Sequence, residues 1–532
     1  MVQPHWKTAA SIGLFASCMI GLVWLTALID ARAWLLLRNT LVLSASACCL
    51  ALPIGLPVAW LLSRTDAWGR HAVRAVTIAM LFMPLYLQAA GWDAGLGRQG
   101  WLPSWSGWPS RLALAGWPAA IWIHALAAVP WIVLVVSYGL RMVEPELEET
   151  ALLDLSVAQV AWRVSLRRAL PAVAIAALWV FVLSSQEIAV TDLYQIRTYA
   201  EEIYTYGPAF GLGSLASAES GIAWAGDAAV LLLLLLVSFC VTAYALVPQQ
   251  QTAPESSRTI ALGGGRLWGG IWLLLTTLVI AGIPCLNLLV QAGITVQRTG
   301  DHWLRVWSGG KIVTLLGRAL VEFRQECFWS LLIAGIAATS ALTAGVLCAG
   351  WLRRALVGHV ATALIVSLGL AVPGPLIGIG IVKWLQLGRL PVLLWLYENS
   401  LFAPVVAQTW RALPIAALIC WHALRSVPQE MREAAAIDGA TFWGSLWRVE
   451  LPMRGPALAA AWLAAFTISM GELSATNLTA PPGVFTLPTR VFGLLHAGVD
   501  DVAAAVCLLV MAATMLSALL ITWLLGRPAH LA

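Results

Sequence analysis

Residues 432–452 read REAAAIDGATFWGSLWRVELP, and they lie between two long apolar runs. The stretch is small and polar at its start and aromatic in its middle. Ser426 is expected to cap a first short helix, with Gln429 completing a capping box. Gly439 is expected to end that helix, because glycine enters the left-handed conformation without penalty. Thr441 can then start a second short helix, so the stretch predicts two short helices joined at a glycine.

The composition predicts that the rest of the chain is buried in lipid. Of 532 residues, 60% are hydrophobic and only 11% are charged, and the mean hydropathy is +0.83. A soluble protein carries roughly 25% charged residues, so this chain has too little polar surface to cover a globule. Lipid cannot satisfy open backbone groups, so an all-α, polytopic membrane protein is expected. The net charge of +5 includes no block of like charge that would suggest nucleic acid.

Twelve apolar runs have the length of a membrane span, about 20 residues. They lie near 9–29, 40–62, 74–95, 117–139, 170–191, 222–247, 267–292, 328–350, 359–384, 402–424, 456–478 and 503–525. The first run could be a signal peptide, but the spans that follow favour an uncleaved helix. A polar, then glycine-rich segment separates the two sets of six. The predicted domains are 1–250, a linker at 251–266, and 267–532.

The two sets of six spans repeat a pattern. The segments that match are 140–143 with 424–427, 149–154 with 433–438, and 162–166 with 447–451. The offset then holds through Glu187, which falls on Glu472. A match at nearly fixed offset over dozens of residues predicts a duplication. Six spans separate the copies, so the halves should pack as a parallel pair about an axis along the membrane normal.

The distribution of Lys and Arg predicts the orientation. With the N-terminus in the cytoplasm, the arginine-rich short connections lie inside the cell, as the positive-inside rule requires. Both patterned loops, near 141–171 and 425–456, are then cytoplasmic.

The second loop resembles a known family signature. Glu433, Ala434, Ala435, Gly439 and the terminal Leu451-Pro452 are similar to the cytoplasmic signature of membrane subunits of binding-protein-dependent ABC importers. In that family the loop is a coupling helix, which docks on a separate ATPase subunit. The resemblance therefore implies a set of ATPase-coupling residues in the two loops: Glu149, Thr150, Ala151, Asp154, Leu155, Glu433, Ala434, Ala435, Asp438 and Gly439.

The first loop departs from this signature. Thr150 stands where the second loop has Ala434, Leu155 stands where it has Gly439, and Arg167 replaces the proline. Leucine in a left-handed turn costs on the order of 1 kcal/mol, so the first loop is expected to turn differently and to dock differently.

The resemblance also implies partners, location and solute. A fused twelve-span chain of this kind is similar to the ferric-iron and thiamine importer permeases of the bacterial inner membrane. It implies two copies of an ATPase subunit and a periplasmic binding protein as partners, with no cofactor in the chain itself. Residues 187–192, 197–204 and 471–476 resemble outer-side segments of the ferric type, so ferric iron is the predicted solute. Thiamine or another small solute is the alternative.

Five residues are candidates for the translocation route. Glu187 and Glu472 fall near the outer ends of equivalent spans, where a charge is costly unless it meets water or a partner; simple solvation of a helix end is the other interpretation. Pro84, Pro373 and Gly374 interrupt corresponding spans, as broken helices do along transport routes, although kinks are also common in membrane helices.

Two rival functions make different predictions. A secondary transporter would place paired ionisable residues deep in the spans, where Arg411 is the main exception to an apolar pattern. A membrane enzyme would need a clustered acid–base or metal set. The sequence has neither a phosphate-binding Gly-Lys-Ser/Thr loop nor a metal-ligand motif, so no catalytic or metal residue is predicted.

Overall fold

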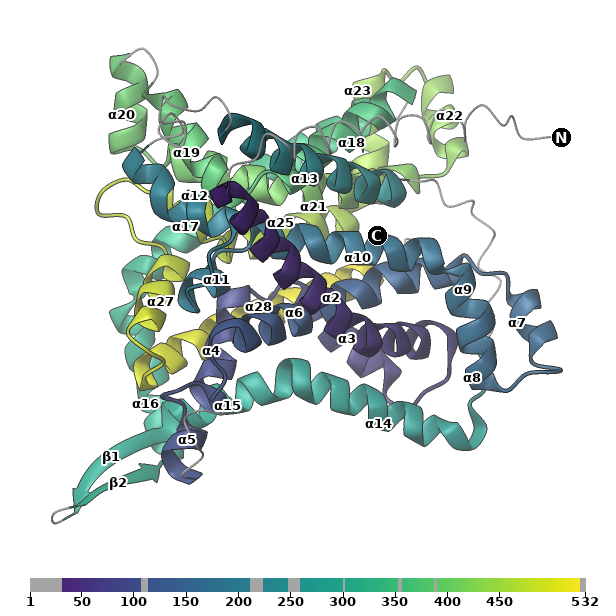
Figure 1. Ribbon diagram of the computed structural model, residues 1–532. Helices are drawn as coiled ribbons and strands as arrows, with labels where there is room; N and C mark the ends of the chain where they lie inside the picture. Colours follow the sequence, from purple (N-terminus) through teal and green to yellow (C-terminus); the bar gives the residue numbers. More distant parts are fainter. Residues whose placement is uncertain are drawn as a thin grey trace.

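The fold is a bundle of helices that matches the expected all-α membrane class (Figure 1). In this computed structural model the described residues are 31–106, 113–210, 223–246, 259–299, 302–352, 356–386 and 390–526. The predicted span at 9–29 lies outside the described residues, as does the first half, 251–258, of the predicted linker at 251–266.

The helices of the first part of the chain are α2 (Ala31–Arg64), α3 (Arg70–Leu81), α4 (Leu85–Leu96), α5 (Trp101–Ser106), α6 (Gly116–Arg141), α7 (Pro145–Ala151), α8 (Val157–Val160), the π-helical turn η2 (Ala161–Ser165), α9 (Leu166–Arg168), α10 (Leu170–Gln186), α11 (Ala189–Leu193), α12 (Tyr199–Phe210) and α13 (Ala223–Leu246).

The second part begins with η3 (Gly263–Gly265), α14 (Arg266–Thr277), η4 (Leu278–Gly282), α15 (Ile283–Gly293), β1 (Ile294–Thr299), β2 (His302–Trp307) and α16 (Gly309–Glu322). It continues with α17 (Arg324–Leu352), α18 (Leu356–Ala371), α19 (Gly374–Leu385), α20 (Pro391–Asn399), α21 (Phe402–Arg425), α22 (Gln429–Ile437), α23 (Phe442–Ser445), η6 (Leu446–Glu450), α24 (Leu451–Met453), α25 (Gly455–Met470), α26 (Ser474–Thr479), α27 (Leu487–His496) and α28 (Asp501–Gly526).

Six of the described helices are long and apolar enough to cross a membrane, or up to ten spans if four sharply bent helix pairs count as one each. The bent pairs include α3 with α4, at 107°, and α18 with α19, at 99°. Helix α13 covers the run predicted at 222–247. The count of twelve therefore stays a prediction, while the predicted interruptions at Pro84 and Pro373 are confirmed.

Helices from the two parts of the chain interlock. α15 packs on α4 and α28, α28 also packs on α3, and α13 packs on α18. Many alanines line the core, among them Ala120, Ala416 and Ala461, which are fully buried. Small side chains let helix backbones approach closely, which is how helices associate in membranes.

A β-hairpin and an amphipathic helix were missed by the sequence prediction. β1 and β2 pair antiparallel, with Ile294 opposite Trp307 and Thr299 opposite His302, and α16 follows directly. In Figure 1 the hairpin projects at the end of the molecule opposite α7 and α22. The sequence of the hairpin lies in a connection between spans, where the search for apolar runs gives no signal.

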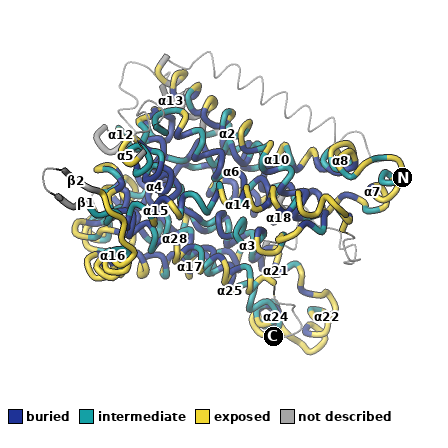
Figure 2. Tube along the Cα trace, turned by 90° about the horizontal axis from the view of Figure 1, so that it is seen from below, coloured by how far each residue is buried: buried dark blue, intermediate teal, exposed yellow. Residues whose placement is uncertain are grey.

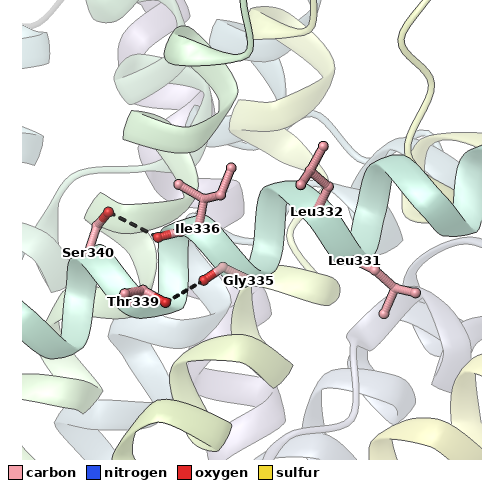
Figure 3. Close-up of a pocket in the computed structure, with 6 residues that line it drawn as sticks. All are labelled: Leu331, Leu332, Gly335, Ile336, Thr339 and Ser340. Carbon is pink, nitrogen blue, oxygen red and sulfur yellow. Dashed lines mark hydrogen bonds between the residues drawn. The ribbon is translucent and has the colours of Figure 1, made fainter.

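Large apolar side chains stay exposed along the sides of the bundle, where Figure 2 shows yellow segments around a dark blue interior. A shallow groove of about 400 Å³ runs along α17 on this surface. Figure 3 shows that Thr339 and Ser340 bond back to the carbonyl oxygens of Gly335 and Ile336, at 2.8 and 2.9 Å. Its polar groups are therefore satisfied, and the groove presents the apolar surface expected towards lipid.

Candidate functional site

The second patterned loop forms two short helices joined at a glycine, as predicted. α22 ends at Ile437, and Gly439 has a φ of 78°. The Thr441 hydroxyl then accepts a hydrogen bond from Gly444 N at 3.2 Å and caps α23. The left-handed glycine and the threonine cap together fix the angle between the two helices.

The predicted start of the first short helix is wrong. Pro428, and not Ser426, lies at the N-cap of α22. Ser426 instead closes α21, and its hydroxyl donates to the carbonyl oxygen of Ala423 at 2.8 Å. Gln429 makes no capping box, because its amide donates to the Glu433 carboxylate one turn later, at 2.7 Å.

The first patterned loop turns without a left-handed residue. Among the described non-glycine residues only Gln195 has a positive φ, so Leu155 avoids the strained conformation that Gly439 adopts. Instead Ser156 caps α8 in a capping box with Gln159, whose side chain accepts from Ser156 N at 3.0 Å. The expectation that the first loop turns differently is confirmed.

Most of the predicted coupling residues lie on the surface of the two loops. Glu149, Thr150, Asp154, Glu433, Ala434, Asp438 and Gly439 are exposed, Ala151 and Leu155 are half-buried, and Ala435 is buried. Figures 1 and 2 place both loops on the side of the molecule away from the hairpin. The two loops therefore lie at the same side of the molecule.

Equivalent apolar side chains are exposed on both loops, which the sequence prediction missed. Leu153 is 83% exposed, and its counterpart in the repeat, Ile437, is 85% exposed. The other exposed counterparts are Leu147 with Met431 and Trp162 with Trp447. Exposed apolar groups gathered at one end of a protein mark an interaction surface. The sequence alone already showed that apolar residues recur at equivalent positions of the two loops.

A buried ion pair ties the first loop to a long helix. The Arg64 guanidinium at the end of α2 lies 3.4 Å from the Glu148 carboxylate on α7, and both side chains are 3% exposed. Ser165 Oγ donates to the other Glu148 oxygen at 2.6 Å, and Arg64 also donates to the carbonyl oxygen of Val143. This joint connects α7, η2 and α2.

The candidate route residues lie where helices break. Pro84 stands at the N-cap of α4, and Pro373 stands at the N-cap of α19. Gly471, between α25 and α26, packs so closely on Pro84 that an added Cβ would come within 2.6 Å of its ring. Gly374 faces Ser474 in a similar close approach. The break after α25 therefore contacts the breaks at Pro84 and at Pro373.

Glu187 and Glu472 cap the short helices that follow them. The Glu187 carboxylate accepts from Ala189 N at 2.7 Å and Val190 N at 3.0 Å. The Glu472 carboxylate accepts from Ala475 N at 2.9 Å and Thr476 N at 2.8 Å. Neither residue matches simple solvation of an exposed helix end, because both are held by the backbone of the next helix.

Glu187 lies near a polar residue of α6, and Glu472 is linked through Thr476 to a polar residue of α21. His124 Nε2 lies 3.5 Å from Glu187. The Gln408 amide donates to Thr476 Oγ1 at 3.1 Å, and Thr476 Oγ1 in turn donates to Glu472. His124 and Gln408 occupy equivalent positions of the repeat. At both breaks, therefore, a capping glutamate lies close to a polar side chain from the equivalent helix position, which is His124 in one case and Gln408 in the other.

Comparison with known proteins identifies the second part of the chain. Residues 329–528 match the family described as binding-protein-dependent transport system inner membrane component. These residues are a permease domain of a binding-protein-dependent ABC importer. The permease is a multi-pass protein of the inner membrane, and its family implies an ATPase and a periplasmic binding protein as partners.

Similar permeases belong to several transport systems. The chain is 27% identical over 233 residues to PhnV of Salmonella typhimurium, assigned to 2-aminoethylphosphonate transport, covering 43% of this chain and 79% of PhnV. It is 28% identical over 200 residues to the putrescine permease PotI of Escherichia coli, covering 37% and 71%. It is 25% identical over 213 residues to YvgM of Bacillus subtilis, assigned to molybdenum transport, covering 37% and 91%.

The family match covers only some of the candidate residues of the permease. Residues 329–528 contain Pro373, Gly374, Glu472 and the second loop with Gly439. The first loop, Pro84 and Glu187 lie outside the match. Among the described residues no group of three or more His, Cys, Asp or Glu side chains could hold a metal ion.

Proposed function

We propose that this permease forms the inner-membrane route of an ABC importer, and that its two patterned loops receive the motion of two ATPase subunits. The observation that supports this most is the pair of loops on one side of the molecule with equivalent exposed apolar side chains. ATP hydrolysis belongs to the separate ATPase subunits. A periplasmic binding protein delivers the solute to the opposite end.

The chain consists of two permease halves, 1–250 and 267–532, joined by the linker 251–266. The order of elements supports this division, because a long helix, a bent pair, a second long helix, a patterned loop and a broken helix occur twice. They are α2 to α11 in the first half and α17 to α26 in the second. The N-terminus is cytoplasmic in this proposal, which puts both loops inside the cell.

The two loops couple unequally. The Gly439 turn and the Leu155 turn have different backbone geometry, so the helix pairs meet an ATPase at different angles. The second loop carries the full family signature and forms the stronger contact.

The route passes between the halves at the helix breaks. Glu187, Glu472, Pro84, Pro373 and Gly374 line or shape it, and the close packing of Gly471 on Pro84 supports a closed state at this level. Rocking of the halves would separate these breaks and open the path.

Ferric iron remains the first solute to test, with thiamine as the alternative. The support is the resemblance of residues 187–192, 197–204 and 471–476 to ferric-type outer segments. The names of the similar permeases specify a phosphonate, a polyamine and molybdenum, so these solutes belong in the same test. The cognate binding protein, purified with its native ligand, should release Fe(III); release of thiamine instead would overturn the iron assignment.

Uptake into reconstituted vesicles tests the importer function itself. We expect uptake only when the ATPase, the binding protein and internal ATP are all present. A secondary transporter would instead show uptake driven by an ion gradient without the ATPase, and that result would contradict the proposal.

A further inference from the structure

A cationic side chain lies inside the bundle, at the contact between the two proposed halves. Arg411 belongs to α21, one of the described spanning helices. A charged group inside a span is costly unless it faces a partner or a water-filled space. The groups around Arg411 therefore indicate what kind of partner can bind there.

The described residues accept only one hydrogen bond from the Arg411 guanidinium. Its Nη1 donates to Gln186 Oε1 of α10 at 2.9 Å, and the Gln186 amide donates in turn to the carbonyl oxygen of Leu370 in α18. A guanidinium has five N–H donors, and glutamine carries no charge to neutralise it. Arg411 is also partly exposed, so donors remain for a further acceptor.

The nearby carboxylate does not pair directly with Arg411. Glu472 acts on Arg411 electrostatically, but no ion pair within 4 Å joins them in the described part of the chain. The oxygens of Glu472 are already occupied by Ser474, Ala475 and Thr476. Glu472 therefore leaves the hydrogen-bond donors of the Arg411 guanidinium unoccupied.

Arg411 and Gln186 lie close to the helix breaks. Gln186 directly precedes Glu187, where α10 ends, and Leu370 lies just before Pro373, where α18 breaks. Gln408, one turn before Arg411 on α21, contacts Thr476 in the break after α25. Arg411 thus lies among the breaks that the proposed route passes.

We propose that Arg411 and Gln186 form an anion-binding subsite on the translocation route, so that the solute carries a carboxylate, phosphonate, phosphate or oxyanion group. This inference rests on the proposed importer function and specifies its solute class. An Arg fork matches the planar and tetrahedral oxyanions through paired hydrogen bonds. If iron is the cargo, it crosses as a complex of net negative charge.

Charged thiol reagents test the subsite without knowledge of the solute. Gln186→Cys is placed in a chain whose nine native cysteines are replaced by serine or alanine, and the permease is assembled with its ATPase in membranes. Labelling rates are measured with anionic sulfonatoethyl and cationic trimethylammonioethyl methanethiosulfonate. The ratio of the anionic to the cationic rate is then compared in the presence of Arg411 and of Arg411→Gln.

We expect Arg411→Gln to lower this ratio about tenfold, because a unit charge at close range in a poorly screened site changes the two rates in opposite directions. Arg411→Lys should keep most of the ratio. Leu516→Cys, on the exposed face of α28, is the control for a lipid-facing thiol and should react with neither reagent.

Ser474→Cys is a second, nearly isosteric position for the same measurement if Gln186→Cys does not assemble. An unchanged ratio in Arg411→Gln, or no reaction at either cysteine in any nucleotide state, would overturn the anion subsite. Co-purification with the ATPase and ATP-driven uptake report on the importer function separately. Their persistence alongside an unchanged ratio would reject the subsite alone.

Discussion

At the scale of single residues, Gly439 has the most specific role in the second loop. Its φ of 78° is costly for a residue with a Cβ, although a Cβ there would meet no heavy atom within 4 Å. The cost of a substitution is therefore one of backbone conformation and not of a steric clash. Gly439→Leu should cost about 1–2 kcal/mol and weaken both ATPase association and uptake, measured by co-purification and by vesicle transport.

Two controls separate backbone strain from the loss of a contact. Gly439→Asn should retain most of the association, because asparagine tolerates the left-handed conformation. Leu155→Gly in the first loop should not strengthen ATPase association, since the backbone at that position is not left-handed. Equal losses in Gly439→Leu and Gly439→Asn would contradict the conformational explanation.

At the scale of elements, the joint between α2 and α7 is expected to hold the first loop in place. Removal of one partner leaves a buried charge unpaired, which costs about 3–5 kcal/mol. Glu148→Gln should therefore lower the thermal stability of the permease by several degrees and reduce the ATPase activity that the permease stimulates. Glu146 is an exposed neighbour of Glu148, and the substitution Glu146→Gln should change neither measurement.

A charge exchange tests whether the pair or only one side chain matters. The double variant Arg64→Glu with Glu148→Arg should recover part of the loss seen in each single variant, measured as a coupling energy in a double-mutant cycle. No coupling between the two substitutions would show that the joint does not depend on the ion pair.

What the sequence could predict at this scale was local. The helix–glycine–helix pattern depends on Gly439 and Thr441, whose effects act within a few residues. Ser426 was assigned to the wrong helix, because α21 continues to Arg425 and Ser426 is needed at its end. Contacts between distant segments, such as Gln186 with Arg411, depend on packing that no local pattern contains.

At the scale of the whole molecule, the predicted spans set the class of fold but not how the two proposed halves interlock. Apolar runs specify burial in lipid, whereas the packing of α13 on α18 and of α28 on α3 depends on which helix surfaces fit together. Pro84 and Pro373 pointed to these breaks, because proline disrupts a helix. Proline alone does not decide a break, since α2, α6 and α21 continue through internal prolines. No sequence pattern indicated that the break after α25 contacts the breaks at Pro84 and at Pro373.

One contact between the two proposed halves is expected to respond to pH. His496, at the end of α27, has Nε2 3.3 Å from Asp192 of α11 and Nδ1 2.9 Å from the carbonyl oxygen of Phe492. The hydrogen bond with Asp192 raises the pKa of His496 above its ordinary value, although burial opposes it. Both ring nitrogens face acceptors, so the protonated imidazole is the form that this contact stabilises.

The direction of the pH effect follows from the raised pKa of the folded state. The contribution of His496 is fully present below its unfolded pKa of about 6.5 and is lost as the pH rises through the higher folded pKa. His496→Gln should therefore lower the melting temperature at pH 5.5 and have little effect at pH 8.5. The pair is partly exposed, so the shift should be on the order of 1 °C. Asp192→Asn should abolish the pH dependence of the difference, and a larger effect of His496→Gln at pH 8.5 than at pH 5.5 would contradict the assigned contact.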